Sequence, residues 1–154
     1  MKKLIALILA AVLVLAAGCA KKDAGLKVDA AAAADKLASS VQFTDQMSAV
    51  ADKTVLKLYG LEQSTVEKLK AYESTGATAE EVAVFEAKDE DAAAKVKEAA
   101  QKRIEDQKAA FQDYQPKEMA KLKNPLLVTA GKYVVLCVSN DNAAAQKAVD
   151  GLTK

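Results

Sequence analysis

The chain has 154 residues, of which 51% are hydrophobic and only 5% aromatic, and it contains no histidine. Its 22 basic and 21 acidic side chains nearly cancel and are interleaved, which argues against a nucleic-acid-binding surface, where basic residues gather on one face. Without histidine, the chain lacks the usual general base at neutral pH and the commonest metal ligand.

Residues 1–18 have the composition of an export signal. Lys2 and Lys3 precede an unbroken apolar run from Leu4 to Ala17. A helix of that length spans about 21 Å, which is shorter than a hydrocarbon core of roughly 30 Å. The segment therefore predicts a cleavable signal peptide and not a membrane-spanning helix.

The end of this segment resembles a bacterial lipobox. Ala16, Ala17 and Gly18 stand directly before Cys19, with alanine at position 16 where leucine is most common. We predict cleavage between Gly18 and Cys19 and a diacylglyceryl group on the Cys19 sulfur, whose two acyl chains suffice for stable membrane attachment. The protein is then expected at the outer face of the bacterial cytoplasmic membrane. In the alternative, the signal is an ordinary secretory one and Cys19 is incidental.

Three segments are expected along the chain: a lipoprotein signal peptide over residues 1–18, a short polar tether over 19–28, and a single domain over 29–154. The length of the third segment fits one domain with a modest core.

The first half of that domain contains two expected helices and two expected strands. Asp29 is a suitable N-cap for a helix over residues 30–40, and a second helix over 49–59 ends where Gly60 favours a left-handed C-cap. Strands are expected over 65–73 and 79–87. Thr78 and Glu81 also form a capping-box pattern, so one helix over 79–114 is the alternative. The β-rich run of residues 82–85 favours the strand.

The second half continues with a long helix over residues 90–114, capped by Asp89 and stopped by Pro116. Strands over 126–130 and 133–139 are joined by Gly131-Lys132, a pair suited to a type II′ turn. The second of these strands is apolar on both faces and is expected inside its sheet. A last helix follows Asn140 or Asp141.

The predicted fold class is α+β. A single four-stranded antiparallel sheet in ββαββα order is expected, packed by the long central helix and the terminal helices.

One set of polar residues on the long helix is a candidate site. A helical wheel places residues 93, 96, 100, 104, 111 and 114 on one face, with Gln107 among them and Arg103 at the edge. A packed arginine needs a carboxylate partner, and the neighbouring strand offers Glu80, Glu81 and Glu86. Either Arg103 forms a structural ion pair, or Arg103, Gln107 and the Tyr114 hydroxyl form a small polar pocket for an anionic ligand or partner side chain.

Other chemistry-bearing residues indicate no catalytic centre. Cys137 lies in an apolar run and is expected to be a buried, inert thiol. The acidic residues 89–91 and Asp141 are interpreted as helix caps. The sequence has no pair of cysteines with zinc-site spacing, no glycine-rich phosphate loop and no Gly-x-Ser-x-Gly motif. We therefore expect no catalytic residue, no metal and no cofactor.

Several segments together resemble a known family. They are residues 58–61, 76–85 and 131–136, with Arg103, Gln107, Phe111, Tyr114 and Pro116 in the intervening helix. Their order and spacing are similar to those of a family of small Gram-positive bacterial lipoproteins, numbered 4358 among the domains of unknown function. The resemblance covers about residues 28–150 and implies a membrane-anchored extracytoplasmic protein. It implies no activity and no functional residue.

The expected function is that of a non-catalytic binding or accessory lipoprotein, which binds a protein, such as an envelope protein, or another envelope component at the outer face of the membrane. An apolar sheet face left uncovered by helices would support it. The alternative is a solute-binding or enzymatic envelope lipoprotein with a small polar pocket around Arg103, which would need a pocket of at least about 300 Å³.

Overall fold

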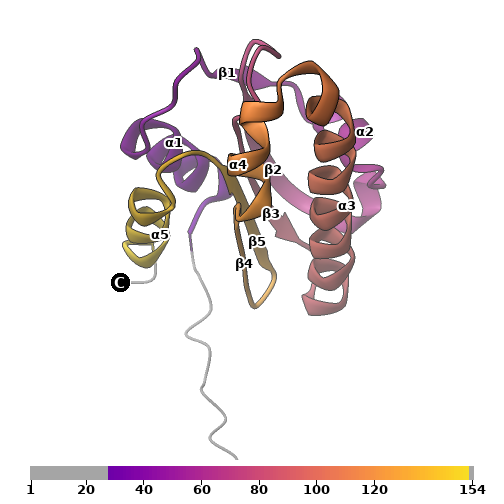
Figure 1. Ribbon diagram of the computed structural model, residues 1–154. Helices are drawn as coiled ribbons and strands as arrows, with labels where there is room; N and C mark the ends of the chain where they lie inside the picture. Colours follow the sequence, from indigo (N-terminus) through magenta and orange to yellow (C-terminus); the bar gives the residue numbers. More distant parts are fainter. Residues whose placement is uncertain (1–27, 153–154) are drawn as a thin grey trace, which may run out of the picture.

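The computed structural model describes residues 28–152 (Figure 1). The predicted signal peptide, the cleavage and lipidation site at Gly18 and Cys19, and the predicted tether up to residue 27 lie outside the described residues.

The described residues contain one antiparallel sheet. Its strands are β1 (Ser48–Val50), β2 (Val66–Glu73), β3 (Glu81–Ala87), β4 (Leu126–Ala130) and β5 (Tyr133–Val138). They lie in the order β1-β2-β3-β5-β4, and every neighbouring pair is antiparallel. The predicted class, α+β with a single antiparallel sheet, is confirmed.

Helices cover both faces of this sheet (Figure 1). Helices α1 (Ala30–Ser40) and α5 (Asn142–Asp150) lie on one face. The other face carries α2 (Asp52–Tyr59), α3 (Glu90–Tyr114) and α4 (Met119–Lys123), with 3₁₀ turns η1 (Gln63–Thr65) and η2 (Pro116–Glu118). The fold therefore has three layers with the sheet in the middle. No apolar sheet face is left open among the described residues.

The central strands β3 and β5 are buried along their whole length. Successive side chains of a strand point to opposite faces, so each of these strands serves two cores. Phe85 and Leu136 pack with α3, whereas Val84 and Cys137 pack with α1 and α5. This arrangement explains why β5 is apolar at every position and β3 at every position except Glu81 and Glu86, and it confirms the interior placement expected for β5.

The prediction of four strands was wrong, because residues 48–50 form a fifth. Two of them, Ala49 and Val50, fall within the helix expected over 49–59, but Ala49 lies opposite Tyr72 at the end of β2. Helix α2 instead begins at Asp52. A three-residue edge strand is held by backbone pairing with its neighbour and leaves no periodic pattern in its side chains.

Most predicted element boundaries agree with the structure. Asp29, Asp89 and Asp141 each accept backbone amides as N-caps of α1, α3 and α5. Gly60 ends α2 with a φ of 63°, and Gly131 has a φ of 55° in the β4–β5 turn, in a region that glycine adopts without strain. The strand β3 excludes the alternative of one helix over 79–114.

The end of α3 differs from the prediction. Residues 93, 96, 100, 104 and 107 are buried as expected, but Tyr114 is 67% exposed and does not face the sheet. The 25 residues of α3 span about 37 Å, whereas the seven residues of β3 span about 23 Å. The last turn of α3 therefore has no sheet beneath it.

No helix within residues 28–152 is both long enough and apolar enough to cross a membrane.

Candidate functional site

Arg103 is the only arginine in the sequence, and it joins α3 to the end of the sheet. Its Nε donates to Glu81 at 3.1 Å, and its Nη2 lies 3.0 Å from Glu81 and 2.9 Å from Glu73. The two glutamates are cross-strand partners in β2 and β3. Their carboxylates lie side by side, so one planar guanidinium bridges both.

The carboxylate of Glu81 is 1% exposed and is surrounded by donors. Besides Arg103, the Tyr59 hydroxyl and Gln107 Nε2 donate to it. A buried carboxylate needs such donors to offset its lost hydration. Burial, together with the charge of Glu81, raises the pKa of Tyr59 well above its usual value, so this hydroxyl stays a donor.

Glu73 is less completely satisfied than Glu81. Its Oε1 accepts from Arg103. Partial burial raises the pKa of Glu73, and the neighbouring charge of Glu81 raises it further, while Arg103 acts in the opposite direction. Two carboxylates share one cation here, so this group, the Arg103 cluster (Glu73, Glu81, Arg103), has a surplus of acid.

Gln107 is 7% exposed and uses only one end of its amide. Because a carboxylate only accepts hydrogen bonds, the Nε2 side must face Glu81. The other end, Oε1, is buried and has no hydrogen-bond partner among the described residues.

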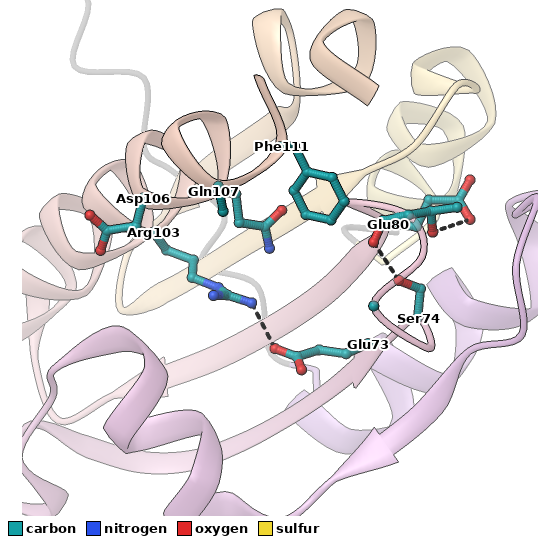
Figure 2. Close-up of a pocket in the computed structure, with 10 residues that line it drawn as sticks. Glu73, Ser74, Glu80, Arg103, Asp106, Gln107 and Phe111 are labelled. Atoms are coloured by element: carbon teal, nitrogen blue, oxygen red, sulfur yellow. Dashed lines mark hydrogen bonds and ion pairs between the residues drawn. The ribbon is translucent and has the colours of Figure 1, made fainter. Parts of the chain in front are cut away.

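A pocket of about 170 Å³ lies between α3 and the β2–β3 hairpin. Figure 2 shows Arg103, Gln107 and Phe111 in a row along α3, above Glu73 and Ser74. Further lining residues are Gly76, Thr78, Glu80, Asp106 and Ala110. We call this the hairpin pocket.

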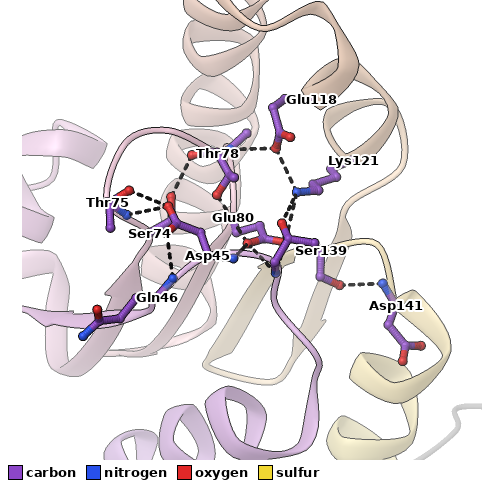
Figure 3. A network of polar contacts seen from close by, with 12 residues as sticks. Asp45, Gln46, Ser74, Thr75, Thr78, Glu80, Glu118, Lys121, Ser139 and Asp141 are labelled. Atoms are coloured by element: carbon purple, nitrogen blue, oxygen red, sulfur yellow. Dashed lines mark hydrogen bonds and ion pairs between the residues drawn. The ribbon is translucent and has the colours of Figure 1, made fainter.

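A second polar group, the Lys121 cluster (Glu80, Glu118, Lys121), lies at the same end of the sheet (Figure 3). Lys121 Nζ is 3.0 Å from Glu80 and 2.9 Å from Glu118, and all three residues are buried. Its third neighbour is Thr44 Oγ1 at 3.1 Å. Two carboxylates again share one cation.

The Lys121 cluster ties three segments together. Glu80 accepts from the backbone amides of Thr44 and Asp45, which belong to the loop before β1. Glu118 accepts from the amide of Ala79 in the hairpin. Burial opposes ionisation of Glu80, but the Thr44 amide and Lys121 outweigh it, and the pKa of Glu80 is lowered.

Residues 39–139 match the family model described as Domain of unknown function (DUF4358). The chain belongs to the DUF4358 family. No curated protein matches it, and no solved structure matches it. The matched span contains the Arg103 and Lys121 clusters, and the family description assigns them no function.

The structure of this DUF4358 chain brings together some of the predicted site residues and separates others. Arg103 and Gln107 meet at Glu81, whereas Tyr114 does not line the hairpin pocket. Of the other two expected partners of Arg103, Glu80 pairs with Lys121 and Glu86 with Lys132 at 2.7 Å.

Sequence reasoning missed Glu73 and Tyr59, and it also left open which glutamate Arg103 would contact. Strand alternation was a usable signal, because Glu81 shares the α3-facing side of β3 with Phe85 while Glu86 has the opposite parity. Hairpin register would then have placed Glu73 opposite Glu81. Nothing in the sequence pointed to Tyr59.

Two remaining features are the absence of a metal-site cluster among the described residues and the state of the Cys137 thiol. Within residues 28–152, no three His, Cys, Asp or Glu side chains lie close enough together to hold a metal ion. Cys137 is buried, and burial raises the pKa of its thiol to about 12.

Proposed function

We propose that this DUF4358 chain is a lipid-anchored protein at the outer face of a bacterial cytoplasmic membrane. Its domain serves there as a non-catalytic binding or accessory module. The observation that carries the anchor is the sequence of residues 2–19, in which two lysines, an apolar run and Ala16-Ala17-Gly18 precede Cys19.

The distance from the proposed anchor to the folded domain is short. Nine peptide units separate Cys19 from Val28, so the tether reaches at most about 30 Å when extended. The fold begins directly afterwards, since Asp29 caps α1. A protein anchored at Cys19 would thus hold its domain close to the membrane surface.

The geometry of the polar residues supports a non-catalytic role. The guanidinium of Arg103 is engaged by Glu73 and Glu81, so it is not free to stabilise a negatively charged transition state. The Cys137 thiol is buried and its raised pKa disfavours the nucleophilic thiolate. Both features are those of residues that hold a fold together.

The second candidate is a solute-binding or enzymatic envelope protein, and the hairpin pocket beside Arg103 favours its binding variant. At about 170 Å³ the pocket is smaller than the roughly 300 Å³ typical of sites for drug-sized ligands. It suits a small chemical group more than a whole solute.

The anchor is tested by comparing the wild-type chain with Cys19→Ala in a bacterial host. We expect the wild-type protein in the membrane fraction and, after phase separation, in the detergent phase. We also expect protease added to intact protoplasts to degrade it. We expect Cys19→Ala to lose the lipid-dependent partition into detergent. Cys137→Ala is the matched control and should behave as wild type, because Cys137 lies in the core. Wild-type protein that is cytosolic and protease-resistant in intact protoplasts would overturn the proposal.

A further inference from the structure

The hairpin pocket has an acidic wall. The Arg103 cluster and the Lys121 cluster each contain two carboxylates and one cation, and members of both line the pocket. Asp106 adds a carboxylate that pairs with Lys102 on the solvent side. Because charge is weakly screened near buried groups, this surplus repels an anion and attracts a cation.

The pocket also presents a buried hydrogen-bond acceptor without a donor. Gln107 Oε1 is the only buried side-chain polar atom of the described residues that lacks a partner. Beside it lies Glu73, whose side chain is 29% exposed and whose Oε1 accepts from Arg103. Buried polar atoms in native proteins are nearly always paired. A ligand that donates hydrogen bonds would satisfy Gln107 Oε1 and could also pair with the Glu73 carboxylate.

The remaining walls suit an apolar stem. Phe111 and Ala110 of α3 line the pocket and offer an apolar surface to the stem. The aromatic ring of Phe111 also favours a nearby positive charge. The volume of about 170 Å³ leaves room for a short chain of methylenes and not for a drug-sized molecule.

We propose that the hairpin pocket binds a primary ammonium group on a short aliphatic stem. The ammonium donates to Glu73 and to Gln107 Oε1, and the stem lies along Phe111. An ammonium has three donors and no acceptor, which matches an acidic wall with an unpaired acceptor. The inference rests on the binding role proposed above and not on the anchor.

The charge of this ligand is opposite to that of the ligand in the pocket alternative considered from the sequence. In that alternative Arg103 would contact an anion, but Glu73 and Glu81 already pair with it, as the ion-pair alternative expected. Among the other hollows, the one of about 390 Å³ beside Lys121 is polar, but Nζ of that lysine already faces three acceptors. Hollows of about 570 and 670 Å³ are larger but contain no unpaired buried atom.

Two sources would supply this chemistry: a lysine side chain of a partner protein and a free alkylamine. Nα-acetyl-lysine amide represents the first and n-butylamine the second. If the lysine derivative binds more tightly than n-butylamine, the ligand is a lysine side chain of a partner protein. If n-butylamine binds equally well or more tightly, the ligand is a free alkylamine.

The test is a titration of the full ¹⁵N-labelled chain in detergent, followed by NMR. The Nε–H signal of Arg103 is assigned directly because the sequence has one arginine. The Gln107 amide signal is identified by its loss in Gln107→Met. We expect saturable shifts of both signals with either amine and none with butyrate, an anion of similar length.

Two variants locate the binding. Glu73→Gln, which removes the charge, should weaken amine binding at least tenfold, and Gln107→Met, which removes the free acceptor, should also weaken it. Glu105→Gln is the control, since Glu105 is exposed on α3 and does not line the pocket. Melting curves establish that each variant is folded. Each of the two pocket variants tests the proposal independently of the other.

The proposal is overturned by the absence of saturable shifts with both amines, by a preference for butyrate, or by unchanged binding in the folded pocket variants. These outcomes leave the anchor intact, because partition into detergent is measured separately. Loss of the anchor in turn leaves the titration unaffected.

Discussion

Arg103 holds two carboxylates at the end of the sheet, and its loss would leave Glu81 buried without its cation. We predict that Arg103→Met lowers the free energy of unfolding by about 3–5 kcal/mol, the usual cost of breaking a buried ion pair on one side. Lys97 lies exposed on the same helix, and Lys97→Met should change stability by less than about 0.5 kcal/mol. Urea unfolding measures both. Equal effects of the two substitutions would show that Arg103 contributes no more than a surface lysine.

Glu73 is the residue whose charge opposes folding. Its pKa is raised above the ordinary 4.5 by burial and by Glu81, against the effect of Arg103. Between pH 4.5 and the raised pKa, Glu73 therefore stays protonated in the folded chain but is ionised in the unfolded chain. The contribution of Glu73 to stability is present below this window and declines as the pH rises through it.

We accordingly predict that the free energy of unfolding of Glu73→Gln, relative to that of wild type, increases as the pH rises from 4 to 7. Glutamine mimics the protonated form of Glu73, which the fold favours. Glu81→Gln should instead be destabilising at pH 7, since its new amide would face the donors of Tyr59, Arg103 and Gln107. Urea unfolding at the two pH values measures this. A Glu73→Gln variant that loses stability relative to wild type as the pH rises would contradict the assignment.

At the scale of elements, the Lys121 cluster fastens the short helix α4 to the hairpin and to the loop before β1. We predict that Lys121→Met speeds hydrogen exchange at the backbone amides of Thr44, Asp45 and Ala79, which donate to Glu80 and Glu118. Amides of β3 and β5 should change much less. Lys123→Met on the exposed side of α4 is the control. Uniform acceleration over the whole domain would contradict a local role for the cluster.

Elements that carry their own signal were predictable from sequence. Helix α3 has a capping aspartate, a periodic apolar face and a terminating proline, and β5 has an uninterrupted apolar run. Strand β1 and helix α4 have no such signals. The three residues of β1 depend on pairing with β2, and the five residues of α4 depend on tertiary contacts of Leu122 and Lys121.

The candidate site was predictable only in part for the same reason. The wheel of α3 placed Arg103 and Gln107 near the sheet, because helical periodicity is local. Their partners depend on strand register and on the packing of α2, which bring together residues distant in sequence. Tyr114 was misplaced because the wheel contains no information on where the sheet ends.

At the scale of the whole molecule, the hairpin pocket lies far from the point where the chain enters the folded domain. Asp29, at the entry to the domain, lies 3.4 Å from Lys68 near the start of β2, whereas Glu73 ends that strand. Five residues of strand place these points about 17 Å apart. A domain anchored at Cys19 would thus hold its pocket apart from the point where the tether joins it.

The anchor is tested most directly by mass spectrometry of the amino-terminal peptide of the protein purified from membranes. Our account predicts a mature chain that begins at Cys19 and carries a thioether-linked diacylglyceryl group, with residues 1–18 absent. An amino terminus that retains residues 1–18, or an unmodified Cys19 thiol on protein recovered from the cytosol, would contradict it.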